Sequence, residues 1–375
     1  MPFSGHPSYA KLMVLLRAGS GTETQRIFHT RGLMNKAPLS FCLLFCIIIS
    51  AGRVLADSTT VSILAVGDVM TGGSMAPWVN DSGPDYPFSK TRSLIQQADI
   101  AVCNLEAPYG IKGKAFDKKF TFLVPPRLAA GLKNAGFDAV AMANNHMMDF
   151  GPEPLKATLV LLDSLDISHS GAGMDLAEAR KPAIVERNGI KVAFLSYSRV
   201  HPTQFWATAK KAGTAPAYEN QIKEDIQRSK ELADIVVVSF HWGAELMDTT
   251  KLYQRTLAHF CIDQGADLVL GHHPHILQGL ELYQGKLIAY SLGNFAFGSR
   301  SRKCTESVIL KTNFDSTGMR RMELIPLCVD NNKVFFKPTP LSGPEGLAVL
   351  SNLARLSRDL GFEFVPGDST AVVEF

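Results

Sequence analysis

The sequence lacks the cysteine spacing of a zinc ribbon or a CxxC site. Its 375 residues include only six cysteines, and no two of them are separated by two residues. A thiolate-based structural metal site is therefore not expected. Cys103 and Cys261 stand in apolar stretches and are predicted to be inert core thiols. Cys304 and Cys328 would pair only if their strands are neighbours, which the sequence does not decide.

Charge is also scarce, and no long run of one sign occurs. Charged residues make up 19% of the chain and leave a net charge of +3. This value is too close to neutral to indicate a nucleic-acid partner, and none is predicted. The densest basic stretches, residues 112–119 and 300–303, are interpreted as solvated loops. The 46% hydrophobic content indicates a globular protein with a substantial core and not a disordered chain.

The apolar run 39–49 is too short for a membrane-spanning helix, which needs about 20 apolar residues. It follows a positive segment at Met34-Asn35-Lys36 and precedes a small-residue cleavage site that ends at Ala56. Residues 34–56 are therefore predicted to be a secretory signal peptide, and residues 1–33 an upstream extension. The alternative is an uncleaved anchor through residues 39–51. Either reading predicts an exported protein, periplasmic or extracellular.

Strand and helix patterns alternate up to about residue 300, which predicts an α/β layered domain over residues 57–303. Residues 304–375 are predicted to be a β-rich part that completes the same domain. Asn188-Gly189 gives the clearest hairpin signal, and the irregular residues 199–218 are interpreted as an insertion near the site. The predicted strands cover 61–66, 100–103, 137–142, 184–186, 191–196, 235–240, 266–270, 286–290, 307–314, 319–329 and 333–337. The predicted helices cover 125–135, 154–165, 218–232, 252–264 and 345–360.

Side chains that can bind a metal ion follow one predicted strand after another. In open α/β sheets, sites lie at the carboxyl ends of the strands. Turn and cap roles explain one or two such residues, but a long succession indicates one shared site. The candidate ligands are Asp68, Glu106, Asn145, His241, His273 and His275.

This mixture of carboxylate, amide and imidazole groups suits Mn, Fe or Zn ions. The set is larger than one tetrahedral site needs, so it suggests two ions that share a bridging carboxylate. Such a pair can activate water and hold both oxygens of a phosphoryl transfer. His146, beside Asn145, is a candidate catalytic acid or charge stabiliser with Asp149 as its orienting partner. The alternative is that His146 only caps the following helix.

These residues resemble the CapA family, the poly-γ-glutamate capsule synthesis proteins of the calcineurin-like metallophosphatase superfamily. The resemblance covers roughly residues 61–300 and also marks Asn104, Glu245, His272 and Asn294 as residues that line the site. The matching motifs are Gly67-Asp68-Val69-Met70, Asn104-Leu105-Glu106, Ala143-Asn144-Asn145-His146 with Asp149 and Gly151, His241-Trp242-Gly243 with Glu245, Gly271 to His275, and Gly293-Asn294-Phe295.

The resemblance implies a four-layer α/β/β/α sandwich of the metallophosphatase type with a dinuclear site. Asp68 and His275 would hold one ion, and Glu106 would bridge. The second ion would be held by Asn145, His241 and His273, with His146 as the acid. Two departures leave a single-ion site open: Met70 stands where the superfamily has a histidine ligand, and Glu106 stands where it has an aspartate.

The resemblance implies an exported protein in the synthesis, export or anchoring of a capsular polymer such as poly-γ-glutamate. A membrane-bound polymer synthase would be its partner, and an anionic polymer or a phosphoester its substrate. One alternative is a metal-dependent phosphoesterase that acts on an unrelated extracytoplasmic substrate. The other is a non-catalytic subunit that binds the polymer or the synthase. The residues by themselves predict only a metal site and export.

Overall fold

The computed structural model describes residues 59–375. The predicted extension, 1–33, and the predicted signal segment, 34–56, lie outside the described residues. Within residues 59–375, no helix has both the length and the apolar character needed to cross a membrane.

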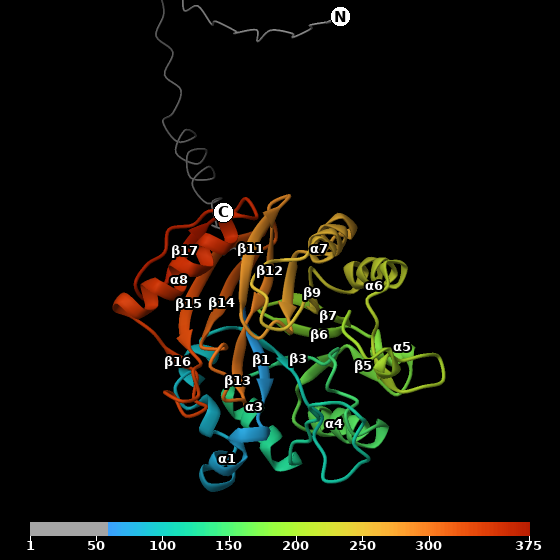
Figure 1. Cartoon of the computed structure of the whole chain (residues 1–375). Coiled ribbons are helices and arrows are strands. Elements are labelled where there is room, and N and C mark those ends of the chain that lie inside the picture. Colours follow the sequence, from blue (N-terminus) through green and yellow to red (C-terminus); the bar gives the residue numbers. More distant parts are fainter. Residues whose placement is uncertain (1–58) are drawn as a thin grey trace, which may run out of the picture. The chain divides into compact units, whose positions relative to one another are not determined.

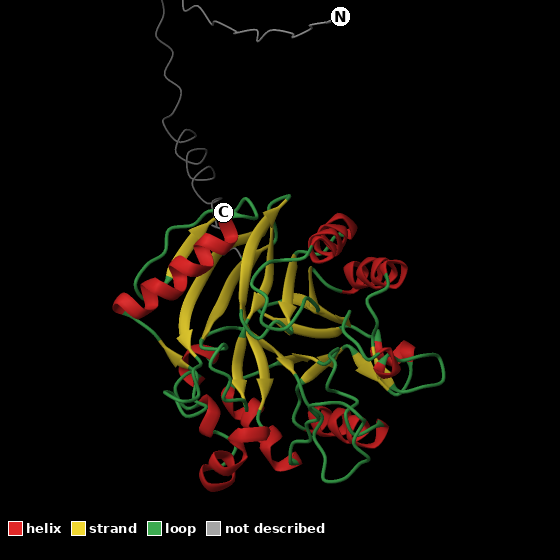
Figure 2. Cartoon of the chain, in the orientation of Figure 1, coloured by secondary structure: helices red, strands yellow, loops and turns green. Residues whose placement is uncertain are grey.

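Two β-sheets form the centre of the described part of the chain (Figures 1 and 2). The order of the first is β16 (Thr339–Pro340), β15 (Gly318–Cys328), β14 (Glu306–Asp315), β1 (Val61–Met70), β2 (Ile100–Leu105), β3 (Ala139–Ala141) and β4 (Ser168–Ser170), with β13 (Asn294–Phe297) beside β1 and β17 (Ala371–Glu374) beside β15. The order of the second is β11 (Leu277–Tyr283), β12 (Lys286–Leu292), β10 (Leu268–His272), β9 (Ile235–His241), β7 (Ile190–Ser198) and β6 (Ala183–Arg187). A small ribbon pairs β5 (Ala172–Gly173) with β8 (Gly213–Thr214).

The central strands are apolar on both faces, which is why the sheets are covered on both sides. In β1, Ile63 and Ala65 belong to the core between the sheets, whereas Leu64 and Val66 belong to the outer core of the first sheet. This division follows from the alternation of side chains along a strand. In β9, Val237 faces the other sheet and its neighbours face the outer helices.

Helices cover the outer face of each sheet, so the predicted four-layer α/β/β/α sandwich is confirmed. Apolar residues of α1 (Ala76–Ser82), α2 (Arg92–Ile95), α3 (Ala130–Ala135) and α4 (Pro152–Ser164) pack in the outer core of the first sheet. Those of α5 (Leu176–Ala179), α6 (Glu219–Leu232) and α7 (Leu252–Gln264) pack in the outer core of the second. Short 3₁₀ helices occupy Gly73–Met75, Tyr86–Phe88, Pro126–Ala129 and Thr203–Phe205.

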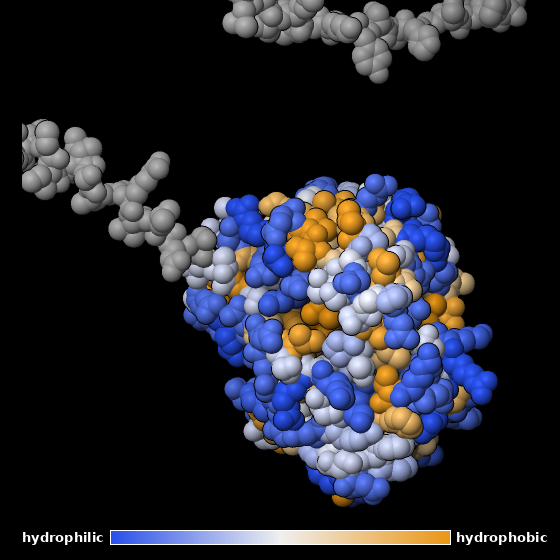
Figure 3. All heavy atoms as spheres, turned by 90° about the vertical axis from the view of Figure 1, so that its left-hand side faces the viewer, coloured by the Kyte–Doolittle hydropathy of each residue, from blue (hydrophilic) through white to orange (hydrophobic). Residues whose placement is uncertain are grey.

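Helix α8 (Gly343–Arg358) closes one open side of the sandwich. Its Val349, Leu350 and Leu353 enter the core between the sheets. The outer surface of this side carries apolar side chains among many polar ones (Figure 3). Strand β14 pairs antiparallel with β1, so the segment after residue 303 contributes strands to the first sheet.

Most local predictions are confirmed, and one strand is wrong. Asn188 and Gly189 join β6 to β7 with φ angles of 54° and 75°, as a tight hairpin turn requires. Residues 333–337, predicted to be a strand, form turns, because the amides of Lys333 and Val334 both donate to the Asp330 carbonyl at 2.8 and 2.9 Å. Cysteines 103, 261, 304 and 328 are all free, and the first two are buried as predicted.

Candidate metal centre

The register of the strands brings the predicted polar residues to one edge of the sandwich. Asp68 of β1 lies opposite Asn104 of β2 and Asn294 of β13. In the other sheet, His272 of β10 lies opposite His241 of β9. All five are buried, with at most 5% of their surface exposed. The carboxyl ends of the central strands of both sheets therefore meet in one buried polar cluster.

Asp68 lies where the two sheets meet. Its Oδ1 is 3.4 Å from His272 Nδ1 and its Oδ2 is 3.3 Å from His275 Nδ1. The backbone amide of His273 also donates to Oδ2, at 3.3 Å. Burial alone would raise the pKa of Asp68, but the hydrogen bonds and charges of His272 and His275 outweigh it and hold the pKa well below its ordinary value. Asp68 is thus an anionic group at neutral pH.

Asn104 orients the two carboxylates, and Asn144 holds Asn104 in place. The side-chain amide of Asn104 donates to Asp68 Oδ1 at 2.8 Å and to Glu106 Oε2 at 3.2 Å. The Asn104 oxygen accepts in turn from Asn144 at 3.2 Å. Asn144 Oδ1 accepts from the backbone amides of His146 and Met147 at 3.1 and 3.0 Å, which shapes the turn after β3. Asn144 was assigned no role from the sequence, although it stands within a matching motif.

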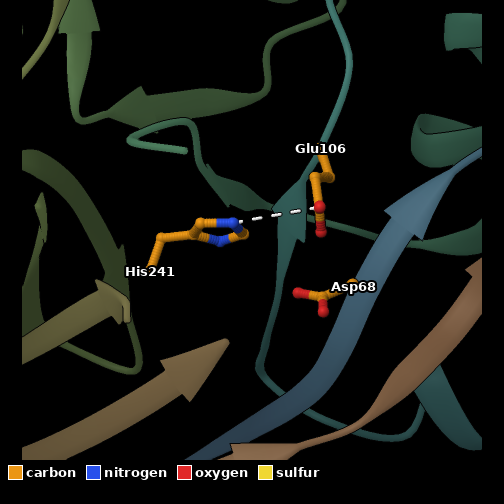
Figure 4. Close-up of side chains that lie close together, drawn as sticks. All are labelled: Asp68, Glu106 and His241. Atoms are coloured by element: carbon orange, nitrogen blue, oxygen red, sulfur yellow. Dashed lines mark ion pairs between the residues drawn. The ribbon is translucent and has the colours of Figure 1, made fainter. Parts of the chain in front are cut away.

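Glu106 has a buried oxygen that faces three imidazoles. Its Oε1 has no hydrogen-bond partner within residues 59–375. The Nε2 atoms of His275, His241 and His146 lie 3.8, 3.9 and 4.0 Å from it. Ligand atoms of Asp68, Glu106 and His241 lie within 4.8 Å of one another, and the three side chains point toward a common space (Figure 4).

This geometry fits a divalent ion better than a hydrogen-bond network. Separations of 3.8 to 4.0 Å are too long for N–H···O hydrogen bonds. Two ligands that each lie about 2.1 Å from one ion are about 3 to 4 Å apart, depending on the angle at the ion. An unpaired buried carboxylate oxygen is costly unless a cation satisfies it. The mixed nitrogen and oxygen donors suit Zn, Mn or Fe.

The other candidate ligands and the residues expected to line the site lie around this cluster. Asn145 Oδ1 is 2.8 Å from His241 Nε2, and the rings of His241 and His273 are 4.7 Å apart. Asn294 Oδ1 is 2.9 Å from His275 Nδ1. Glu245 is exposed in the loop after β9, and its charge adds to the burial and the Asp68 charge that raise the pKa of Glu106.

His146 is held by a buried aspartate and by a lysine that the sequence did not reveal. Its Nδ1 is 2.7 Å from Asp149 Oδ2. Lys118 Nζ is 3.1 Å from the same nitrogen and forms an ion pair with Asp149. Residues 112–119 were predicted to be a solvated loop, which is wrong for Lys118, since only 18% of its side chain is exposed. No spacing in the sequence relates Lys118 to the turn after β3.

The histidines of the cluster differ in protonation. Burial and the neighbouring His275 lower the pKa of His273 to about 3, and burial holds the pKa of His241 well below its ordinary value. Burial also lowers the pKa of His146. For His275, burial is outweighed by the charge of Glu106 and by the Asp68 contact, and the pKa rises to about 9. Burial and the charge of Asp68 raise the pKa of Glu106. His275 is therefore the protonated group that faces Glu106 at neutral pH.

This protonation predicts opposite pH dependences for stability and for metal affinity. The pKa of His275 is about 9 in the folded protein and about 6.5 when unfolded. Between these values the folded state binds more protons, so the metal-free protein should lose on the order of 3 kcal/mol of stability as pH rises from about 6.5 to 9. Metal affinity should rise over the same window, because an ion must displace this proton. Urea unfolding and Mn²⁺ titration calorimetry measure the two slopes.

His275→Gln removes the proton and should flatten the stability slope. Calorimetry in buffers of different ionisation enthalpy should show release of about one proton per ion by the wild type near pH 8. A stability that rises with pH over this window, or metal uptake without proton release, would contradict the assignment.

Comparisons with known proteins agree with the resemblance stated above. The model of the family described as "Bacterial capsule synthesis protein PGA_cap" matches residues 62–299. The PGA biosynthesis protein CapA of Bacillus subtilis (strain 168) is 32% identical over 315 residues, which cover 82% of this chain and 83% of that protein. A probable polyglutamine synthesis accessory protein of Mycobacterium tuberculosis (strain CDC 1551 / Oshkosh) is 30% identical over 223 residues, 56% of this chain and 59% of that protein.

Among solved structures, a 5'-nucleotidase precursor from Thermus thermophilus is similar with a TM-score of 0.42 and 12% identity. The match covers 72% of this chain and 54% of that chain.

Proposed function

We propose a function from one premise: the chain belongs to the bacterial capsule synthesis protein family PGA_cap. In this proposal it acts in the synthesis, export or anchoring of an anionic capsular polymer such as poly-γ-glutamate. The names of its relatives, which refer to PGA biosynthesis and to polyglutamine synthesis, support the polymer. The word "accessory" in the second name supports a role beside a membrane-bound synthase. Export through residues 34–56 is part of the proposal.

The proposal includes a divalent-metal centre at the strand ends. The observation that carries it is Glu106 Oε1, a buried acceptor without a hydrogen-bond partner in residues 59–375 that faces three imidazoles. Asp68 and His275 would hold one ion, Asn145, His241 and His273 a second, and Glu106 would lie between them. A bound ion of this kind supplies Lewis acidity toward a carbonyl or phosphoryl oxygen.

The chain's own residues would orient a reacting group and move a proton. Asn104 fixes Asp68 and Glu106 through its two amide hydrogen bonds. Asp149 holds the Nδ1 side of His146, so Nε2 faces the centre, 4.0 Å from Glu106 Oε1. Nε2 is therefore the atom of His146 that can exchange a proton with a group bound there. This arrangement favours hydrolase-type chemistry over a purely structural metal site.

Gene replacement in the native host tests the proposal. Deletion of the gene should remove the glutamate polymer from the cell surface and medium, measured as glutamate after acid hydrolysis. Wild-type protein should restore it, and His241→Ala should not, because a proposed ligand is lost. His259→Ala, which removes a histidine stacked on Tyr283 outside the cluster, should restore it fully. Polymer levels that are unchanged after deletion would refute the proposed function.

His146→Ala separates catalysis from binding in the same experiment. If the site is catalytic, this variant should be produced and should bind metal, but it should not restore the polymer. Full restoration by His146→Ala would instead support the non-catalytic subunit that binds polymer or synthase.

A further inference from the structure

Residues 110–124 form an irregular loop that closes on itself and reaches the metal centre. The loop ends are joined by hydrogen bonds from Gly110 N to Val124 O at 2.8 Å and from Val124 N to Pro108 O at 3.0 Å. Between them the described chain contains no helix or strand. We call residues 110–124 the basic loop, because it carries lysines at positions 112, 114, 118 and 119.

The middle of the basic loop is fastened to the turn after β3. The backbone amide of Phe116 donates to the Asp149 carbonyl at 2.8 Å, and that of Phe122 donates to Asp149 Oδ2 at 2.7 Å. The ring of Phe122 lies over the His146 imidazole, with centroids 4.4 Å apart. The loop is thus attached to the candidate catalytic pair through both backbone and side-chain contacts.

Lys118 brings a charged group of this loop into the site. Its ammonium group donates to the backbone carbonyl of Asn145, contacts His146 Nδ1 at 3.1 Å and forms an ion pair with Asp149. Asp149 has no exposed surface, so Lys118 supplies the charge partner that a buried carboxylate needs. The side chain of Asn145 meanwhile points to His241 Nε2, at 2.8 Å. One lysine therefore restrains a proposed metal ligand and the candidate acid together.

We propose that Lys118 is a positioning residue of the metal centre, and that through it metal occupancy and the order of the basic loop are coupled. The inference rests on the metal centre of the proposed function. If the Lys118 contacts favour the conformation of Asn145 that binds the ion, then binding of the ion must stabilise those contacts by the same factor. An ion should therefore hold the loop in place, and loss of Lys118 should weaken binding of the ion.

Mn²⁺ titration calorimetry of Lys118→Met and Lys119→Met tests whether loss of Lys118 weakens metal binding. Both variants lose one positive charge from the same loop, but Lys119 is exposed, with its ammonium group over Phe120 and not in the site. Lys118→Met should bind Mn²⁺ about 10- to 100-fold more weakly, the usual effect of losing a partner that orients a ligand. Lys119→Met should bind like the wild type, and Lys118→Arg should recover part of the loss.

Limited trypsin digestion of the wild-type protein tests whether a bound ion orders the basic loop, and it needs no variant. Mn²⁺ should slow cleavage after the exposed residues Lys112, Lys114 and Lys119. Cleavage after Lys333, in the turn after β15, should keep its rate and serves as the reference. If Lys118→Met does not fold, the digestion of the wild-type protein tests the inference by itself.

The outcomes separate this inference from the metal centre itself. Wild-type protein that binds no Mn²⁺ removes the centre and the inference together. Wild-type binding with equal affinity in Lys118→Met, or Mn²⁺ without effect on cleavage of the basic loop, overturns the role of Lys118 and leaves the centre standing.

Discussion

Replacement of Glu106 by glutamine is expected to abolish tight metal binding while it stabilises the metal-free protein. Glu106 is fully buried, and one of its oxygens has no hydrogen-bond partner within residues 59–375. Neutralising it should recover about 1 to 3 kcal/mol, the usual cost of leaving such a group unsatisfied. The same change removes the charged atom that three imidazoles face. Mn²⁺ affinity should therefore fall by about 100-fold or more, which exceeds the usual effect of losing a residue that only orients a ligand.

Thermal unfolding with and without excess Mn²⁺ measures both effects of Glu106→Gln. The metal-free variant should melt above the metal-free wild type, and Mn²⁺ should stabilise only the wild type. Glu186→Gln is the matched control, since it removes the same charge from an exposed position of β6. A variant that is destabilised without metal, or that retains the full Mn²⁺-induced rise in melting temperature, would show that Glu106 contributes to folding and not to metal binding.

A methyl group at Gly67 is expected to damage both the fold and the centre. The added Cβ would lie 1.8 Å from the backbone oxygen of Gly293. That oxygen accepts the 3.0 Å hydrogen bond from the amide of Asp68. Gly293 directly precedes β13, which pairs with β1 from Asn294 onward. The strands must separate to admit the methyl group, so Gly67→Ala should cost about 3 kcal/mol or more, at the upper end for overpacked sites. Asp68 would move away from Asn294, which lies opposite it.

Urea unfolding and Mn²⁺ calorimetry of Gly67→Ala check this expectation. Gly285→Ala is the comparison, because that glycine lies in the open β11–β12 turn at φ 74° with no atom close to the added Cβ. It should cost only about 1 kcal/mol, through backbone strain, and leave metal affinity unchanged. Equal costs for the two variants would mean that the β1–β13 contact does not require the glycine.

The sequence sufficed for the parts of the site that depend on strand ends. Residues such as Asp68 and His241 each end a buried apolar run, and parallel strands in one sheet place their ends together. The register that sets Asp68 opposite Asn104 was not predicted, since the pairing of β1 with β2 shifts between Ala65 and Asp68. The burial of β1 on both faces follows from its continuous apolar run.

The sequence failed where loops decide the contacts. Lys118 lies in a loop without periodicity, so nothing in its spacing indicates contact with Asn145 or Asp149. Residues 333–337 have an apolar pattern typical of a strand, but two amides bonded to the Asp330 carbonyl turn the chain there.

Anomalous diffraction from crystals grown with Mn²⁺ tests the metal centre most directly. We expect an anomalous peak about 2 to 2.5 Å from Glu106 Oε1, within ligand distance of His241 Nε2 or His275 Nε2. A second peak on the other side of Glu106 would establish the two-ion form, and a single peak the one-ion form that Met70 leaves open. Absence of any peak beside Glu106, in crystals that contain Mn²⁺ at a concentration sufficient to occupy surface sites, would contradict the metal centre.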